Sequence, residues 1–235
     1  MKTGSRKARE ANQRRQSRQA RNRMVLIAAS GAAALVIGLI VVGALLRGGS
    51  EPVTHSAPTE GYVLGSPSAS VVITAWEDFQ CPICKAANSS TLRVIEDEYV
   101  SSGKAQLVFR QFPFLGPEST LAAEASQCAA DQGEFWDYHD ALFTAQAAEN
   151  SGVFSKTRLK QIAASVNLEP VAFASCLDSG AHSASVAAEK AEGVDLGVKG
   201  TPTFFVNGKR VEDWTDYGAF AALIDSALQE VAQVE

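Results

Sequence analysis

Cysteine and histidine are scarce in this chain: its 235 residues include four cysteines and three histidines. Two of the cysteines, Cys81 and Cys84, form a Cys-x-x-Cys pair, and the chain has neither a second such pair nor a Cys-x-x-His. Because a structural zinc site needs four such ligands, usually in two close pairs, this scarcity argues against zinc. A purely structural disulfide across two residues would add little, since so short a loop removes little chain entropy. The pair therefore predicts redox chemistry, and we expect neither a bound metal nor a cofactor.

Positive charge is scarce after residue 23. The whole chain has a net charge of −5, but residues 1–23 carry nine Lys or Arg and one acid, which leaves −13 for the rest. This basic arm lacks aromatic residues and directly precedes a long apolar run, a pattern that is not typical of nucleic-acid binding. We therefore predict a cytoplasmic arm that binds no nucleic acid. A protein that couples nucleic acid to the cell envelope is the alternative.

Charged residues are absent from residues 24–46. As a helix this apolar run would span about 34 Å, enough to cross a hydrocarbon core of about 30 Å. The cations before it place the N-terminus in the cytoplasm and the rest of the chain outside the membrane. A cleavable signal peptide is the alternative, but its apolar region usually has about 7–15 residues and ends at a small-residue cleavage site. We predict a single-pass anchor, followed by a polar linker over residues 47–60.

Beyond residue 60 the hydrophobic pattern alternates between strand and helix periodicity. Apolar, β-branched runs predict strands at residues 62–64, 71–75, 105–112 and 203–206, the last of which returns through an Asn-Gly turn to residues 209–211. Helical spacing predicts helices at residues 84–100, 118–131, 134–148, 155–166, 170–178, 182–196 and 217–231. This order predicts an α/β fold whose core, residues 61–116 and 197–235, is interrupted by an all-helical domain over residues 117–196.

The sequence Cys81-Pro82-Ile83-Cys84 stands where the strand over residues 71–75 gives way to a helix. The first cysteine then lies at a helix N-terminus, where unpaired N–H groups and the helix dipole stabilise a thiolate. The second lies about one turn further on, within disulfide reach. Pro82 suits the first helical turn because it lacks an N–H that would be unpaired there. This arrangement predicts a site of thiol–disulfide exchange.

Three further motifs accompany the Cys-x-x-Cys pair: Arg110-Gln111-Phe112-Pro113, Gln132-Gly133-Glu134-Phe135-Trp136 and Thr201-Pro202-Thr203. With them, residues 61–235 resemble the DsbA-like thiol–disulfide oxidoreductases of the thioredoxin superfamily. The resemblance implies a thioredoxin fold with an inserted helical domain and a cis peptide bond before Pro202. The single N-terminal anchor is similar to the arrangement in actinobacterial and other Gram-positive members.

The resemblance also assigns roles in the site. It implies that Cys81 is the attacked sulfur and that Cys84 is the buried partner that re-forms the disulfide. It further implies that Thr201 and Pro202 present the backbone edge on which an extended substrate peptide pairs.

Other residues near the pair are expected to modulate it. Pro82 and Ile83 supply neither a cation nor a side-chain donor, whereas the strongest oxidants of the family have a histidine between the cysteines. We therefore expect a milder oxidant, whose thiolate is stabilised mainly by the helix terminus and backbone N–H groups. The family often has a buried acid six residues before the nucleophile, and here Ala75 stands in that place. Glu77 or Asp78 can substitute as the proton-transferring acid; solvated acids at a strand end are the alternative.

The remaining cysteines fall in the predicted helical domain. Cys128 and Cys176 each share a helix face with apolar residues, so both thiols are expected to point into that domain. In an exported domain two such cysteines usually pair, and we predict a structural disulfide rather than a second redox pair. We expect His139 to be a packing or helix-surface residue rather than a catalytic one.

These features predict an enzyme that introduces disulfides into exported, cysteine-containing proteins. The resemblance implies reoxidation by a quinone-linked membrane protein of the vitamin K epoxide reductase-like type. No dimerisation segment is evident, so we expect a monomer. The alternatives are a disulfide reductase or isomerase, and a redox-inert chaperone or binding module on the same fold.

Overall fold

The computed structural model describes residue 55 and residues 57–233. The predicted basic arm and the predicted anchor over residues 24–46 lie outside the described residues. None of the helices in the described part of the chain is both long enough and apolar enough to cross a membrane.

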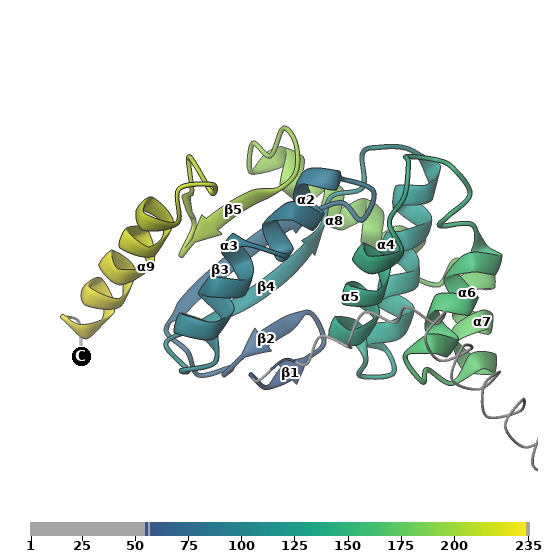
Figure 1. The fold of residues 1–235 in the computed structure, drawn as a ribbon, viewed down its shortest axis with the longest axis horizontal. Helices are drawn as coiled ribbons and strands as arrows, with labels where there is room; N and C mark the ends of the chain where they lie inside the picture. The colour runs from purple at the N-terminus through teal and green to yellow at the C-terminus, as the bar shows by residue number, and fades with distance from the viewer. Residues whose placement is uncertain (1–54, 56, 234–235) are drawn as a thin grey trace, which may run out of the picture. The chain divides into compact units, whose positions relative to one another are not determined.

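A mixed sheet forms the centre of the described domain (Figure 1). The order of its strands is β1-β2-β4-β3-β5-β6. Their bounds are β1 (Thr59–Glu60), β2 (Val63–Gly65), β3 (Val71–Glu77), β4 (Ala105–Gln111), β5 (Thr203–Val206) and β6 (Lys209–Arg210). β3 and β4 are parallel, and every other neighbouring pair is antiparallel. The sheet starts with β1, inside the segment that the sequence predicts as linker.

The two central strands, β3 and β4, determine where the Cys-x-x-Cys motif lies. β4 alternates buried and half-buried residues, and β3 does the same at its start but is buried throughout its last three residues. The pair runs in register from Val71 opposite Ala105 to Glu77 opposite Gln111, as the predicted strand–helix–strand order requires. The carboxyl ends of both strands therefore meet at one edge of the sheet, where ligands and active sites of parallel sheets usually lie. The Cys-x-x-Cys motif follows β3 at this edge.

The connection between β3 and β4 corrects one prediction. In place of a single helix over residues 84–100, the chain forms three shorter segments. They are the α-helices α2 (Pro82–Asn88) and α3 (Thr91–Ile95) and the short π-helix η1 (Glu96–Val100). Two serines separate the first two helices. Ser89 Oγ donates to the carbonyl of Lys85 at 2.9 Å, and Ser90 Oγ donates to that of Ala86 at 2.6 Å. Such side-chain bonds compete with the helical ladder, and Ser90 leaves helical geometry with φ −129° and ψ −96°.

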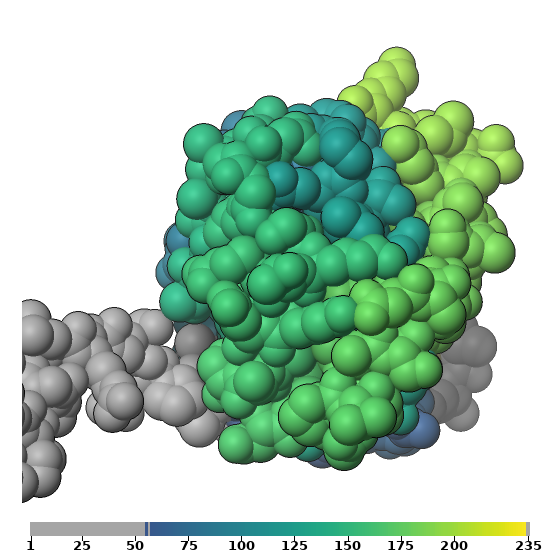
Figure 2. Space-filling view, turned by 90° about the vertical axis from the view of Figure 1, so that its right-hand side faces the viewer, coloured from purple at the N-terminus to yellow at the C-terminus, as the bar shows by residue number. Residues whose placement is uncertain are grey.

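Between β4 and β5 lie the helices of the predicted insertion. They are α4 (Pro117–Ala130), α5 (Phe135–Ala145), α6 (Lys156–Ser165), α7 (Pro170–Ser179) and α8 (Ser183–Asp195). Figure 1 shows α4 to α7 grouped beside the sheet, and α8 contacts both α4 and β4. Figure 2 shows one face of the molecule largely covered by this green part of the chain, with yellow-green residues near position 200 at its upper right edge. The predicted disulfide is present: Cys128 of α4 is bonded to Cys176 of α7, with 5.9 Å between their Cα atoms.

The C-terminal part closes the core. β5 and β6 are joined at Asn207 and Gly208, both of which have positive φ, as the predicted Asn-Gly turn requires. α9 (Tyr217–Ala232) contacts β3 and β5 and buries Phe220, Ile224 and Ala227. The domain is thus an α/β thioredoxin-type core interrupted by helices.

Candidate active site

Cys81 occupies the N-cap position of α2, just beyond the loop that follows β3. Its N–H donates to the carbonyl of Asp78 at 2.9 Å, and its own carbonyl accepts the N–H of Lys85 at 3.2 Å. Pro82 occupies the first turn, as predicted, and the side chain of Ile83 is 53% exposed. Cys81 is 5% exposed, whereas Cys84 is completely buried. Within the motif the first sulfur is therefore the one that an incoming thiol can reach.

The two thiols differ in acidity. A hydrogen bond with the Cys84 thiol is the main cause that lowers the pKa of Cys81 from 9.0 to about 6, against the opposing effect of burial. The side chain of Thr201 and the backbone N–H groups of Cys84 and Ile83 lower it further, because hydrogen-bond donors to the sulfur stabilise the thiolate. The sequence predicts the helix terminus and backbone N–H groups as the main cause; the largest single contribution comes instead from the neighbouring thiol, and the backbone N–H groups add to it. Burial raises the pKa of Cys84 well above its ordinary value.

Thr201 and Pro202 lie against the cysteine pair although about 120 residues separate them from it. Cys81 Sγ donates to the carbonyl of Thr201 at 3.4 Å. The peptide bond between Thr201 and Pro202 is cis, as the resemblance implies. The structure therefore brings four of the predicted site residues together at the end of β3.

The structure distinguishes the two candidate acids. Glu77 ends β3, is 1% exposed, and accepts a hydrogen bond from Asn88 Nδ2 on its Oε2 at 2.6 Å. Burial raises the pKa of Glu77 to about 8, with a further contribution from Cys81 and an opposing one from Asn88. Glu77 in turn helps to raise the pKa of Cys84. It is thus a buried acid electrostatically coupled to both thiols.

Asp78 has a different position. Its carboxylate accepts the backbone N–H groups of Gln80 at 2.8 Å, of Phe114 at 2.8 Å and of Leu115 at 3.1 Å. These bonds hold the loop after β3 to the loop after β4. Asp78 therefore shapes the backbone around the motif, and the geometry favours Glu77 as the proton-transferring acid.

Amide side chains that the sequence did not reveal fix the motif's loop. Gln146, which caps the C-terminal end of α5, donates from Nε2 to the carbonyls of Phe79 and Cys81. Gln80 donates to Ser119 Oγ at 2.9 Å and accepts the N–H of Asn150 at 2.6 Å. Their partners lie 39 to 70 positions away in the chain. Only the packing of the helical insertion against the motif creates these contacts, so no local sequence pattern could have indicated them.

The other sulfur and imidazole groups lie apart from this chemistry. Donor atoms of Cys128, Cys176 and His182 are within 4.8 Å of one another, but the two sulfurs are bonded to each other. His139 is 2% exposed and packs among aromatic rings, including those of Phe79 and Phe143, which agrees with its predicted packing role.

Known proteins share this fold. A family model described as Thioredoxin matches residues 57–226. The chain is a DsbA-like member of the thioredoxin superfamily. Disulfide bond formation protein D of Bacillus subtilis is 28% identical over 185 residues, which cover 77% of this chain and 83% of that protein. This DsbA-like chain also superposes on the crystal structure of oxidised BdbD from Bacillus subtilis with a TM-score of 0.68 and 26% identity, covering 75% of this chain and 100% of that one. Its fold matches that of Wolbachia pipientis alpha-DsbA1, with a TM-score of 0.65 and 22% identity over 77% of this chain and 100% of that one.

Proposed function

We propose that this chain is an extracytoplasmic thiol–disulfide oxidoreductase that introduces disulfides into exported proteins. The observation that carries the proposal is the unequal acidity of its two thiols. The pKa of Cys81 is lowered to about 6, whereas burial raises that of Cys84. The name of the Bacillus subtilis relative, Disulfide bond formation protein D, supports the same direction of transfer.

The proposed reaction has two exchange steps. A substrate thiolate attacks Cys81 Sγ, forms a mixed disulfide and breaks the bond to Cys84, which leaves as a thiol after taking up a proton. A second substrate thiolate then attacks the substrate sulfur of the mixed disulfide and expels Cys81 as a thiolate. Two electrons pass from the substrate to the cysteine pair. Thiols of low pKa leave faster, so the acidity of Cys81 favours the second step.

Thr201, Pro202 and Glu77 assist these steps. The carbonyl of Thr201 contacts Cys81 Sγ, so backbone bonds to an extended substrate peptide beside the cis bond would hold the substrate sulfur at the site. Glu77, with its pKa raised to about 8, is protonated at neutral pH and can give a proton to the departing Cys84. It takes the proton back when the pair is reoxidised.

The pKa of Cys81 also limits how oxidising the Cys81–Cys84 pair can be. Thioredoxin has a thiol pKa of about 7 and a potential near −270 mV, and each unit of further depression favours reduction by about 30 mV. A pKa of about 6 therefore makes this pair a slightly stronger oxidant than thioredoxin. It remains far from the strongest oxidants of the family, near −120 mV. The chain is thus proposed as a mild oxidase.

We further propose that an anchor over residues 24–46 holds a monomeric catalytic domain outside the membrane, where a quinone-linked membrane protein reoxidises it. The Cys128–Cys176 disulfide supports an oxidising compartment, since such bridges are rare in the cytosol. A membrane-impermeant maleimide should label reduced Cys81 in intact cells. Labelling that requires cell lysis would contradict this location.

The decisive experiment equilibrates the full-length chain with defined ratios of reduced and oxidised glutathione and measures the fraction of the Cys81–Cys84 disulfide. We expect a potential between about −270 and −120 mV. A potential at or below the lower value would favour a reductase. The same chain, once oxidised, should form disulfides in a reduced, unfolded substrate protein, and Cys81→Ser should abolish this activity. Turnover that survives Cys81→Ser would contradict the proposed site.

A further inference from the structure

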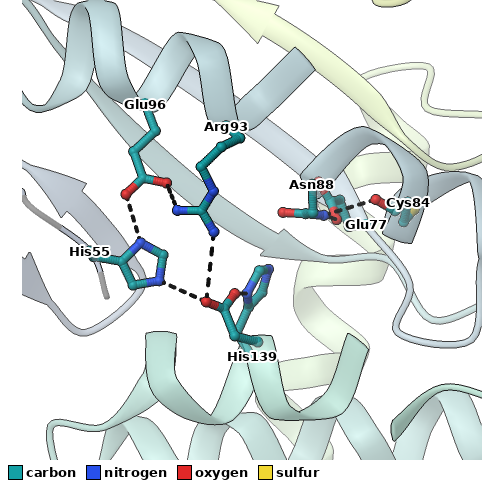
Figure 3. A network of polar contacts seen from close by, with 8 residues as sticks. His55, Glu77, Cys84, Asn88, Arg93, Glu96 and His139 are labelled. Atoms are coloured by element: carbon teal, nitrogen blue, oxygen red, sulfur yellow. Dashed lines mark hydrogen bonds and ion pairs between the residues drawn. The ribbon is translucent and has the colours of Figure 1, made fainter. Parts of the chain in front are cut away.

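Asn88, the last residue of α2, connects the buried acid to the helix that carries the buried thiol. Its Nδ2 donates to Glu77 Oε2 at 2.6 Å and to the backbone carbonyl of Cys84 at 3.0 Å. Figure 3 shows Asn88 beside Glu77, with Cys84 next to them. One amide group therefore bonds both to the acid and to the turn of α2 that holds the second cysteine.

The two oxygens of Glu77 are not equivalent. Oε2 accepts the hydrogen bond from Asn88, whereas Oε1 is buried and has no hydrogen-bond partner among the described residues. A buried polar atom without a partner is costly and calls for a functional explanation. Because the amide N–H already donates to Oε2, the proton of the neutral carboxyl group is favoured on Oε1. The unpaired atom is therefore the one that carries the exchangeable proton.

We propose that Asn88 is a positioning residue, which fixes Oε2 of Glu77 and thereby keeps Oε1 available to exchange a proton with Cys84. This inference rests on the proposed function, because it concerns the proton that Cys84 gains or loses in each exchange. Among the described residues, Asn88 forms no hydrogen bond with either sulfur, so we infer that it acts through Glu77.

Electrostatics agree with this geometry. The Asn88 bond lowers the pKa of Glu77 against the effect of burial, so its loss should raise that pKa further above 8. The titratable groups of the motif that act on Glu77 or respond to it are Cys81 and Cys84. On the neighbouring elements, Arg110 of β4 pairs with Glu189 of α8 at 3.7 Å and also with Glu192 of α8. Asp78, next in sequence, has its carboxylate bonded to three backbone N–H groups.

Reoxidation by oxidised glutathione isolates the step that Asn88 should affect. The Cys81 thiolate attacks one glutathione sulfur, forms a mixed disulfide and releases a glutathione thiolate. Cys84 then loses its proton to Glu77, attacks Cys81 Sγ and releases the second glutathione thiolate, so that two electrons pass from the cysteine pair to glutathione. Only the second step requires deprotonation of Cys84. Acid quenching and mass spectrometry of the full-length chain measure both steps, because they detect the mixed disulfide directly.

Asn88→Leu removes a hydrogen bond to the Glu77 carboxylate, which corresponds to at least one unit in the pKa of Glu77. We therefore expect the midpoint of the pH profile of the second step to rise by about one unit. At pH 7 fewer Glu77 side chains would then be deprotonated, and the second step should be about tenfold slower. Asn88→Asp replaces the donor with an acid of about the same size, and should raise the midpoint at least as far. The first step should keep its wild-type rate. Glu77→Gln should slow the second step at every pH except in the alkaline range, where hydroxide itself deprotonates Cys84.

The double variant Glu77→Gln/Asn88→Leu decides whether Asn88 acts through Glu77. We expect it to match Glu77→Gln, since the two residues form one unit. Additive effects, or an unchanged pH midpoint in both Asn88 variants, would overturn the proposal. Wild-type rates of Cys81 alkylation confirm that a variant has folded. If the proposed function itself were wrong, the wild-type chain would show no turnover of substrate thiols, whatever the pH profiles of its variants.

Discussion

Gln146 Nε2 donates to the backbone carbonyl of Cys81 at 3.0 Å and to that of Phe79 at 2.7 Å. Gln146 follows α5 of the helical insertion, whereas both carbonyls belong to the loop that leads from β3 into the Cys-x-x-Cys motif. The insertion is therefore part of the proposed active site, because it holds the backbone carbonyl of Cys81 in place.

Replacing Gln146 tests this relationship. Gln146→Leu removes two hydrogen bonds, so the free energy of unfolding should fall by about 1–2 kcal/mol. The rate of Cys81 alkylation should change as well, because the loop loses its restraint. Gln229→Leu, at an exposed glutamine on α9, is the matched control and should leave both quantities unchanged. Equal behaviour of the two variants in urea unfolding and alkylation would show that the Gln146 bonds do not hold the loop.

The acidity of Cys81 predicts a specific pH profile. In the reduced protein, the rate of alkylation of Cys81 by iodoacetamide should rise with a midpoint near pH 6, which is its lowered pKa. The Cys84 thiol is the main cause of this lowering, so Cys84→Ala should move the midpoint towards the ordinary value of 9.0. Cys84→Ser keeps a hydroxyl donor and should move it less. A midpoint that stays near pH 6 in Cys84→Ala would exclude the Cys84 thiol as the cause.

Ionisation of Cys81 should also make the unfolding free energy of the reduced protein depend on pH. The pKa of Cys81 is lower in the folded than in the unfolded reduced chain, so its contribution to stability is lost as pH falls through 6 and is fully present above 9. The unfolding free energy of the reduced protein relative to reduced Cys81→Ser should therefore rise by about 2–4 kcal/mol between pH 6 and 9. Denaturant titrations at four or five pH values measure this difference, and a flat profile would contradict the lowered pKa.

A largely buried ionic network connects His55, Arg93, Glu96, His139 and Asp140. His55 contacts Glu96 Oε1 through Nδ1 at 2.8 Å and Asp140 Oδ2 through Nε2 at 3.1 Å, and Arg93 bonds to Glu96 Oε2 at 2.7 Å (Figure 3). His139 Nδ1 lies 2.8 Å from the other oxygen of Asp140. The network joins the segment before β1, the helices after the motif, and α5 of the insertion.

His55 should make stability decline at alkaline pH. Burial lowers its pKa, but the bonds to Asp140 and Glu96 more than offset this and raise it to about 9. A raised pKa gives stability that is fully present below 6.5, the ordinary value, and is lost as pH rises through 9. In the oxidised protein, where Cys81 does not titrate, the advantage of wild type over His55→Gln should shrink by about 1–2 kcal/mol across this range. A constant difference from pH 6 to 10 would mean that His55 is not charged in the fold.

The sequence predicted those parts of the fold and site that local patterns determine. The β-branched run before Cys81, the Pro at the start of α2 and the Asn207-Gly208 turn each constrain the backbone by their own chemistry, and all three took the predicted form. The cis bond before Pro202 came from family resemblance alone. The prediction of one helix over residues 84–100 was wrong, because the side chains of Ser89 and Ser90 bond back to carbonyls of their own helix and compete with its backbone bonds.

Contacts between distant segments could not be predicted in this way. Glu77 and Asp78 are adjacent acids at the end of one strand, and only the fold shows that one is buried beside Asn88 while the other binds backbone N–H groups of the β4 loop. Neither Gln146 nor His55 belongs to a motif. Their roles depend on partners 65 and 41 positions away, which a single sequence does not identify.

The disulfide between Cys128 and Cys176 offers the last test, because it lies apart from the exchange site. It closes a loop of 48 residues between α4 and α7. By the chain-entropy model, Cys128→Ala/Cys176→Ala should lower the unfolding free energy by about 4 kcal/mol. If the bridge is structural, the glutathione potential of the Cys81–Cys84 pair should stay at its wild-type value in this variant. A potential that moves together with stability would instead mean that the bridge communicates with the active site through α4 and α5.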